Sequence, residues 1–238
     1  MSSSKKNIVI FAVMAGLVLT TLTVGVIGSV RNNNYVVVAI VFTAIGMSVL
    51  AVMINQHRVR LLLRDRTPDR IIAHYHRSVR RIPHADAAAA YLSALAATFY
   101  GQFDRARLEL ETVDWDQTTP VYRGHRLYVL ATLALLEGTD YPRALQLARQ
   151  AQELESRSEG GGLQALDDVI HAVAEGPTPE MIARLERVAK KQQGLMPGMC
   201  AWALAVYYKR EGQMDKAADF KELLRMAVPF SAPMLKTS

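Results

Sequence analysis

The chain has almost no cysteine, and its glycines follow no repeat of three. Cys200 is the only cysteine among 238 residues, which excludes a disulfide scaffold. The 14 glycines, without a period of three, exclude a collagen-like chain. Half of the residues are hydrophobic, so the chain is too apolar to be disordered. We therefore expect a folded protein of one or two domains.

The sequence also lacks the motifs of common enzymes. It contains no glycine-rich phosphate loop, no GxSxG and no HExxH. His74 and His76 are two residues apart, so on a helix they point about 200° apart and cannot share a metal ion. Cys200 lies in an apolar helical run, which predicts a buried thiol and not a catalytic one. We expect no catalytic residue, no cofactor and no metal site, and therefore no enzyme.

Positive charge is not in excess over the larger part of the chain. The formal net charge is +6, yet residues 82–238 carry 17 basic and 20 acidic side chains. The excess lies in residues 55–81, where eight arginines accompany two aspartates, and in Lys5, Lys6 and Arg31. A nucleic-acid-binding domain carries its basic residues on the folded body. The distribution therefore argues against a nucleic-acid partner.

Two long apolar runs contain no charged residue. Residues 8–30 cover 23 positions and residues 35–54 cover 20, and each run is long enough as a helix to cross a bilayer. The short linker at 31–34 predicts an antiparallel transmembrane hairpin. A cleaved signal peptide within residues 1–30 is the alternative, but the apolar run is too long and no A-x-A site follows it.

Basic residues flank the predicted hairpin on one side. Lys5 and Lys6 precede the first span and several arginines follow the second, whereas the linker holds only Arg31. The positive-inside rule then places both the N-terminus, residues 1–7, and the remainder of the chain in the cytoplasm. The alanine- and arginine-rich composition favours a bacterial inner membrane. Since neither span contains an ionisable residue, a transporter or channel is not expected.

Residues 55–83 are predicted to form a basic juxtamembrane segment. The second span is expected to continue as helix, and a break at 67–69, with Thr67 as N-cap, starts a new helix over 68–82. One face of that helix carries arginines, and the opposite face is apolar and carries Ile71, Ile72, Tyr75, Val79 and Ile82. The alternative to lipid contact is that the apolar face packs on later helices and the arginines are solvated. The side chains predicted to contact anionic lipid headgroups are Arg58, Arg60, Arg64, Arg66, Arg70, Arg77 and Arg81.

A short phrase recurs through the rest of the chain. Residues 101–106 read GQFDRA and residues 212–217 read GQMDKA, each between two helix-length stretches. Related phrases with inserted residues occur at 138–144 and, more weakly, at 176–183. The alanines that end the four phrases, at 106, 144, 183 and 217, lie 38, 39 and 34 residues apart. A period near 34–40 residues with two helices per unit indicates a helical solenoid.

The phrase resembles the turn of the tetratricopeptide repeat family, whose unit carries a similar G-x-(aromatic)-D-x-A sequence. The resemblance covers about residues 84–228. It implies an all-α fold in which the transmembrane hairpin is followed by a solenoid of about four helix pairs, with a generic α-solenoid as the alternative. Residues 229–238 contain Pro229 and Pro233 and are expected to form an extended tail.

The resemblance also implies a partner-binding groove, lined by the first helix of each unit, and hence a binding scaffold. The chain would then be a membrane-anchored scaffold or assembly factor that binds a partner protein at the cytoplasmic face. The alternative function is an accessory subunit of a larger membrane complex, held mainly through its hairpin. For Tyr91 and Trp202 the alternative role is packing between repeats. The implied groove residues are Tyr91, Leu95, Thr98, His125, Tyr128, Thr132, Met199, Trp202, Val206 and Lys209.

Overall fold

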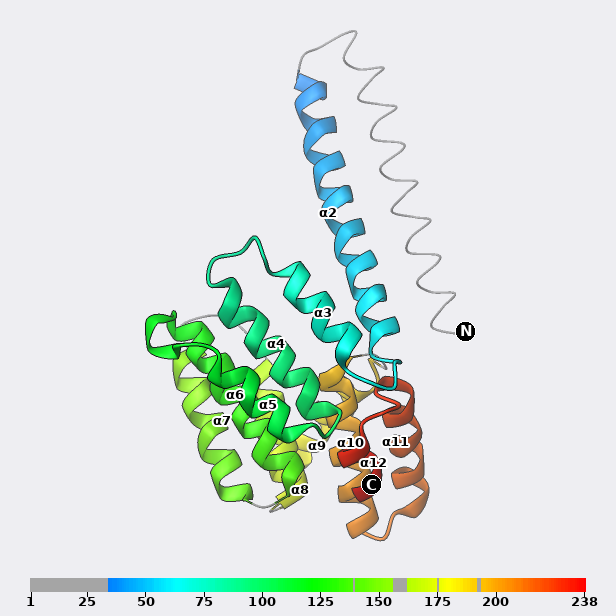
Figure 1. Cartoon of the computed structure of the whole chain (residues 1–238). Coiled ribbons are helices and arrows are strands. Elements are labelled where there is room, and N and C mark those ends of the chain that lie inside the picture. The colour runs from blue at the N-terminus through cyan, green and yellow to red at the C-terminus, as the bar shows by residue number, and fades with distance from the viewer. Residues whose placement is uncertain (1–33, 139, 156–161, 175, 192–193) are drawn as a thin grey trace. The chain divides into compact units, whose positions relative to one another are not determined.

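The computed structural model describes residues 34–138, 140–155, 162–174, 176–191 and 194–238 (Figure 1). The chain divides into two compact units, Met1–Val59 and Arg60–Ser238. Within the described ranges every regular element is a helix and none is a strand. The predicted all-α fold is therefore confirmed.

The first described element is the long helix α2 (Asn34–Leu62), which contains the second predicted span, 35–54. Many of its large apolar side chains are exposed, among them Ile40, Ile45 and Met47 at 53–65%. Among the described residues, no helix combines the length and the apolar character needed to cross a membrane. The first predicted span, 8–30, and the predicted N-terminal segment before it lie outside the described residues.

In the described part of the second unit, the last residues of α2 are followed by α3 (Asp69–Ser78) and then by eight helices, which we describe as four consecutive pairs. A 3-10 helix, η1 (Trp115–Gln117), precedes the second pair, and α12 (Ala232–Thr237) follows the last. Both the tetratricopeptide assignment and the division into about four repeats stay predictions. The pairs are α4 (Ala85–Phe99) with α5 (Phe103–Glu111), α6 (Pro120–Glu137) with α7 (Tyr141–Glu155), α8 (Gly162–Ala174) with α9 (Pro179–Ala189), and α10 (Leu195–Arg210) with α11 (Met214–Ala227).

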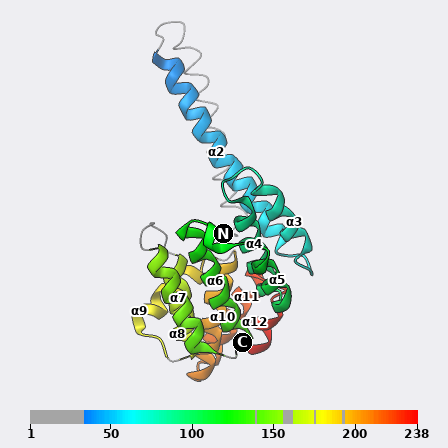
Figure 2. The same cartoon turned by 60° about the vertical axis from the view of Figure 1, so that its left-hand side comes forward.

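Contacts between pairs join them into one body. Helix α4 packs on α6, α7 packs on α8, and α10 packs on both α8 and α9. Figure 2 shows α4, α6 and α7 as neighbouring helices. The shared hydrophobic core reaches from α4 to α12, and its largest fully buried side chains include Phe99, Leu135, Leu166, Leu204 and Leu224.

The two closest copies of the recurring phrase form the same turn. Gly101 and Gly212 have φ values of +74° and +73°, in the left-handed region that glycine adopts without strain. The Gly101 N–H donates to the Thr98 carbonyl at 3.0 Å and the Gln102 N–H to the Ala97 carbonyl at 2.9 Å. Gly212 and Gln213 repeat these two bonds at 3.2 and 2.8 Å. This pair of bonds closes the first helix and directs the chain back along it.

In the second and third pairs a side chain also caps the second helix, although Gly138 of the second pair keeps a positive φ of +69° and its N–H bonds to the Leu135 carbonyl at 3.2 Å. The Asp140 Oδ1 accepts a hydrogen bond from the Arg143 N–H at 2.9 Å. The Thr178 Oγ1 accepts one from the Met181 N–H at 3.4 Å. Such caps satisfy main-chain donors at the start of the second helix.

The predicted alanine of the third pair is wrong by one residue. Ala106 and Ala144 are fully buried. The main-chain N–H of each donates a hydrogen bond to the carbonyl of the residue four positions earlier, which precedes the second helix. In the third pair that bond joins the Ile182 N–H to the Thr178 carbonyl at 3.1 Å, and Ala183 is exposed. The two prolines flanking Thr178 in the sequence lengthen the phrase, so counting to the next alanine gave the wrong position.

An ion pair between a buried carboxylate and a partly exposed arginine joins the helices of the third pair. Both carboxylate oxygens of Asp168, whose side chain is 3% exposed, accept hydrogen bonds from Arg184 at 2.8 Å. The two parallel bonds fix α9 against α8 and satisfy the buried charge. Sequence reasoning gave this aspartate no role.

The single cysteine is buried, as predicted. Cys200 has no exposed surface and no disulfide partner. Burial raises the pKa of its thiol to about 12, because an apolar environment disfavours the thiolate. The protonated thiol is a small apolar group in α10 and not a nucleophile.

The prediction of an extended tail at 229–238 is wrong. Residues 232–237 form α12, with Met234 fully buried in the common core. Pro233 lies in the first turn of this helix, where the missing N–H costs no hydrogen bond. Two prolines therefore do not prevent a helix when one of them stands at its start.

We predict that Gly101→Ala destabilises the fold more than Gly212→Ala. Both substitutions strain a left-handed backbone, at about 1–2 kcal/mol each. A Cβ at Gly101 would also lie 3.1 Å from Cγ of Pro233, whereas a Cβ at Gly212 would meet nothing within 4 Å. Urea unfolding followed by circular dichroism measures both losses. Equal losses in the free energy of unfolding would show that Pro233 moves aside without destabilising the fold.

Candidate functional site

Helix α3 separates an apolar face from a basic face, and the apolar face is covered. Ile71, Ile72 and Val79 are 0%, 5% and 8% exposed, and α3 packs on α4. The structure thus agrees with the alternative in which this face packs on the following helices. The helix is shorter than predicted, because Pro68 and not Thr67 is its N-cap and residue 79 ends it.

The predicted lipid-contacting arginines of the second unit are exposed. Arg70 has 77% of its side chain exposed and lies 3.6 Å from Asp65. The Arg77 Nε donates a hydrogen bond to the Ala73 carbonyl of its own helix at 3.1 Å. Arg64, Arg66 and Arg81 are exposed as well. Arg58, in the other unit, is also exposed. The side chain of Arg60 lies outside the described residues.

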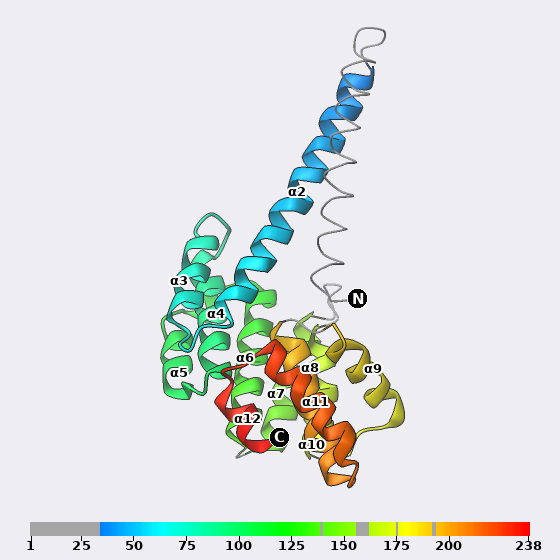
Figure 3. The same cartoon turned by 90° about the vertical axis from the view of Figure 1, so that its right-hand side faces the viewer.

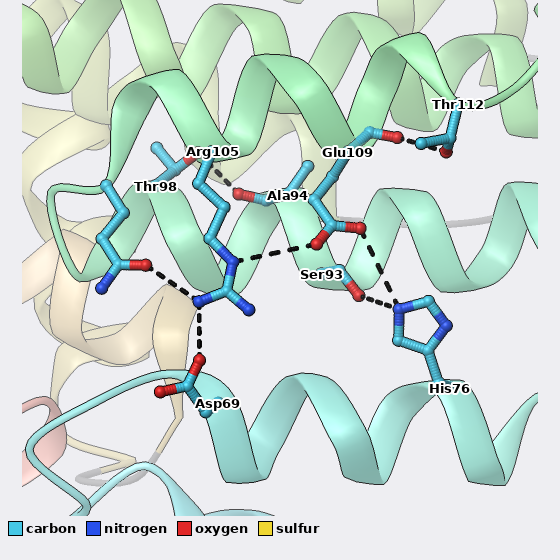
Figure 4. Close-up of polar contacts among 9 residues, drawn as sticks. Asp69, His76, Ser93, Ala94, Thr98, Arg105, Glu109 and Thr112 are labelled. Carbon is cyan, nitrogen blue, oxygen red and sulfur yellow. Dashed lines mark hydrogen bonds and ion pairs between the residues drawn. The ribbon is translucent and has the colours of Figure 1, made fainter.

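A polar cluster centred on Arg105 connects the start of α3 to α5 (Figure 4). The Arg105 Nη1 donates to Asp69 Oδ1 at 2.7 Å and to Gln102 Oε1 at 3.1 Å. Its Nε lies 3.9 Å from Glu109 Oε1. The hydrogen bond from Arg105 is the main reason that the pKa of Asp69 is lowered. The guanidinium thus bridges one carboxylate on α3 and another on α5.

The other end of the cluster joins α3 to α4 and α5 through His76. Its Nε2 lies 3.2 Å from Ser93 Oγ and 4.0 Å from Glu109 Oε2. A serine–histidine–carboxylate relay needs the hydroxyl and the carboxylate on opposite ring nitrogens. Here both groups approach the same nitrogen, and Ser93 is completely buried. The arrangement fixes the position of α3 and does not activate Ser93.

A tyrosine at the end of α4 holds the residues that precede α3. The Tyr100 hydroxyl lies 2.9 Å from the Asp65 carbonyl and 3.1 Å from the Leu63 carbonyl, and its single proton is shared between these two acceptors. Burial raises the pKa of Tyr100 to about 12, so the hydroxyl stays a donor at neutral pH. Sequence reasoning missed Tyr100, Arg105 and Glu109. The only available signal was the Arg105–Glu109 spacing of four, which also describes many solvated pairs.

Half of the implied groove residues belong to the core. The first helices of the pairs are buried on most sides, since 11 of the 15 residues of α4 are buried. The two threonines bond within their own helices, Thr98 to the Ala94 carbonyl and Thr132 to the Tyr128 carbonyl. These side chains therefore offer no surface to a partner in the folded unit. The buried members are Leu95, Thr98, Thr132, Met199 and Trp202.

The other implied groove residues keep some exposure. Lys209 is exposed, and Tyr91, His125, Tyr128 and Val206 are partly exposed. The rings of Tyr91 on α4 and His125 on α6 stack with centroids 4.5 Å apart and planes at 19°. The structure thus brings together two predicted residues that lie 34 positions apart in the sequence.

An aromatic cluster continues from this stack. Tyr122 meets His125 edge-on at 5.8 Å and lies 5.7 Å from the ring of His84. The His125 Nδ1 is buried and has no hydrogen-bond partner among the described residues. Burial lowers the pKa of His125, so its ring is neutral at pH 7. A neutral ring among tyrosines suits apolar or aromatic contact better than binding of an anion.

The chain matches no protein-family model, no curated protein and no solved structure. Its function is therefore inferred from its own residues.

We predict that the apolar face of α3, and not the Arg105 cluster, supplies most of its attachment. Ile71→Ala should lower the free energy of unfolding by about 3 kcal/mol, because it removes buried methyl groups. Asp69→Asn should change it far less, since Asp69 is well exposed and surface ion pairs contribute little. Chemical denaturation of both variants checks this. A larger loss for Asp69→Asn would make the polar cluster the main attachment.

Proposed function

We propose that this chain is a membrane-anchored scaffold or assembly factor with tetratricopeptide-like helix pairs. Residues 8–30 and 35–54 form a transmembrane hairpin, and the four helix pairs bind a partner protein at the cytoplasmic face of a bacterial inner membrane. The observation that carries the proposal is the exposed apolar surface of α2, followed in the chain by a run of exposed arginines. An apolar surface of this kind needs a membrane or another apolar partner to cover it.

The arginines support contact with anionic headgroups. With the apolar face of α3 buried, this contact is electrostatic, and α3 does not insert into the acyl region while it is packed on α4. Each arginine near an anionic surface contributes about 1 kcal/mol. The hairpin therefore provides the anchor, and the arginines help to orient the protein at the membrane surface. These arginines are Arg64, Arg66, Arg70, Arg77 and Arg81.

The second candidate is an accessory subunit of a larger membrane complex. The same exposed side chains of α2, such as Val52 and Ile54, support it, because neighbouring membrane helices would cover them equally well. Replacing residues 1–54 with an unrelated hairpin distinguishes the two candidates. Loss of the co-purifying complex favours the accessory subunit, and its retention favours the scaffold.

We predict that the full chain resists extraction from membranes by alkaline carbonate, since apolar spans hold a hairpin in the bilayer when electrostatic contacts at the surface are disrupted. Protease added outside spheroplasts should leave the helix pairs intact, and protease added after lysis should cleave them. Release by carbonate would refute the anchor, and cleavage before lysis would refute the orientation.

The lipid contact has a separate measurement. In reconstituted full-length chain, hydrogen exchange over residues 64–81 should be slower in vesicles with anionic lipid than in zwitterionic vesicles. Changing Arg66, Arg70 and Arg77 to Gln should remove that difference. Changing the exposed Arg143, Arg149 and Arg187 should leave it unchanged. Equal effects of both triple variants would show a general charge effect without a defined surface.

We predict that the exposed part of the implied groove contributes to partner binding. The double variant Tyr128→Ala, Lys209→Glu should capture less of each partner found by cross-linking and mass spectrometry, by about tenfold or more for a true hot spot. The control variant Leu108→Ala, Arg187→Glu makes matched changes at exposed positions outside the implied groove. Leu108 lies on α5 and Arg187 on α9, which are second helices of their pairs. Identical partner sets for both variants would refute the groove.

A further inference from the structure

The segment Ser231–Ser238 docks on the helix pairs through one buried side chain and two hydrogen bonds. Met234 is completely buried. The Trp202 Nε1 donates a hydrogen bond to Thr237 Oγ1 at 2.8 Å. The Lys221 Nζ donates one to the main-chain oxygen of Ser238 at 2.6 Å. One apolar anchor and two polar contacts thus hold these residues.

The segment touches pairs that are far apart in the sequence. Helix α12 contacts α6 of the second pair and both α10 and α11 of the fourth. Pro233 lies against Gly101, in the turn of the first pair. Figure 3 shows α12, in red, between α6 and α11. The segment therefore covers surface on the first helices α6 and α10, the helices to which the groove was assigned.

Several features favour reversible docking. A helix of six residues is not stable in isolation, so the segment would unfold on release. The Ser231 Oγ is buried without a hydrogen-bond partner among the described residues, which weakens the docked state. The preceding residues Pro229 and Phe230 are partly exposed and belong to no helix. Met234 is the one fully buried apolar side chain of the segment, and Leu235 packs partly against the same core.

We propose that residues 231–238 act as a releasable latch that occupies a peptide-docking surface over Trp202. The surface takes a short helical segment with one buried apolar side chain, Met234, and a hydroxyl three residues after it, Thr237. Its occupant is this chain's own 231–238. The proposal rests on the scaffold function in one respect: release would open Trp202 to a partner. The docking itself needs no partner.

The first test compares two substitutions on α12 in the full chain. Met234→Glu places a charge at the buried anchor, and Ala232→Glu places the same charge at an exposed position. Met234→Glu should raise hydrogen exchange over residues 232–238 by at least tenfold, with a smaller rise in α10, and leave α7 and α9 unchanged. Ala232→Glu should change none of these. Exchange that rises equally in all helices would overturn the latch, because α12 would then be part of the cooperative fold.

A second variant perturbs docking without changing the segment. Gly101→Ala presses on Pro233, whereas Gly212→Ala strains an equivalent turn that has no neighbour within 4 Å. Only Gly101→Ala should raise exchange in α12. Equal exchange in the two variants would count against the latch.

The third test supplies the segment in trans. A labelled peptide of residues 231–238 should bind the chain that lacks these residues, and its Met234→Glu form should bind at least tenfold more weakly. Absence of binding to a chain that keeps its helical circular dichroism would overturn the docking surface. Partner capture by the same deleted chain is measured separately, so loss of the scaffold function and loss of the latch give different results.

Discussion

Close approach of helices through alanine is the constraint on which this fold depends. In α4 the buried residues include Ala87, Ala90, Ala94 and Ala97, and α10 buries Ala201, Ala203 and Ala205. Side chains of this size let a helix be surrounded on nearly every side without leaving voids. The first helices consequently serve as the interior of the unit, and the second helices and α12 cover them. The recurring turns place the second helix of a pair at the short interhelical distance that this packing requires.

This constraint explains which predictions could be made from the sequence. The two closest phrases, ending at Ala106 and Ala217, encode their turn locally through a glycine and the hydrogen bonds around it, so the helix pairs were predictable. The groove was not, because helical periodicity does not reveal that α4 and α10 are buried on most sides. The spacing of Thr98 and Thr132 along their helices fits an exposed face as well as a buried one. Their hydroxyls are satisfied inside the helix, which only the structure reveals.

Contacts between distant residues account for the remaining differences. Asp69 and Arg105 are 36 positions apart, and Tyr100 reaches back 35 positions to Asp65. No local pattern predicts such contacts, which add to the packing of Ile71 and Ile72 on α4 in holding α3 against the helical body. The α3 arginines were predictable as an exposed basic face because charge pattern alone determines that property. The α12 helix was missed because its stability comes from the burial of Met234 by residues far away in the sequence.

The buried state of Cys200 has a practical consequence for this protein. The chain has no second cysteine, and the thiol in α10 is both inaccessible and strongly protonated. A cysteine introduced at a surface position can therefore carry a spectroscopic label while the native residue is left in place. The same native thiol becomes reactive only when α10 separates from its neighbours, so its alkylation rate reports opening of the core.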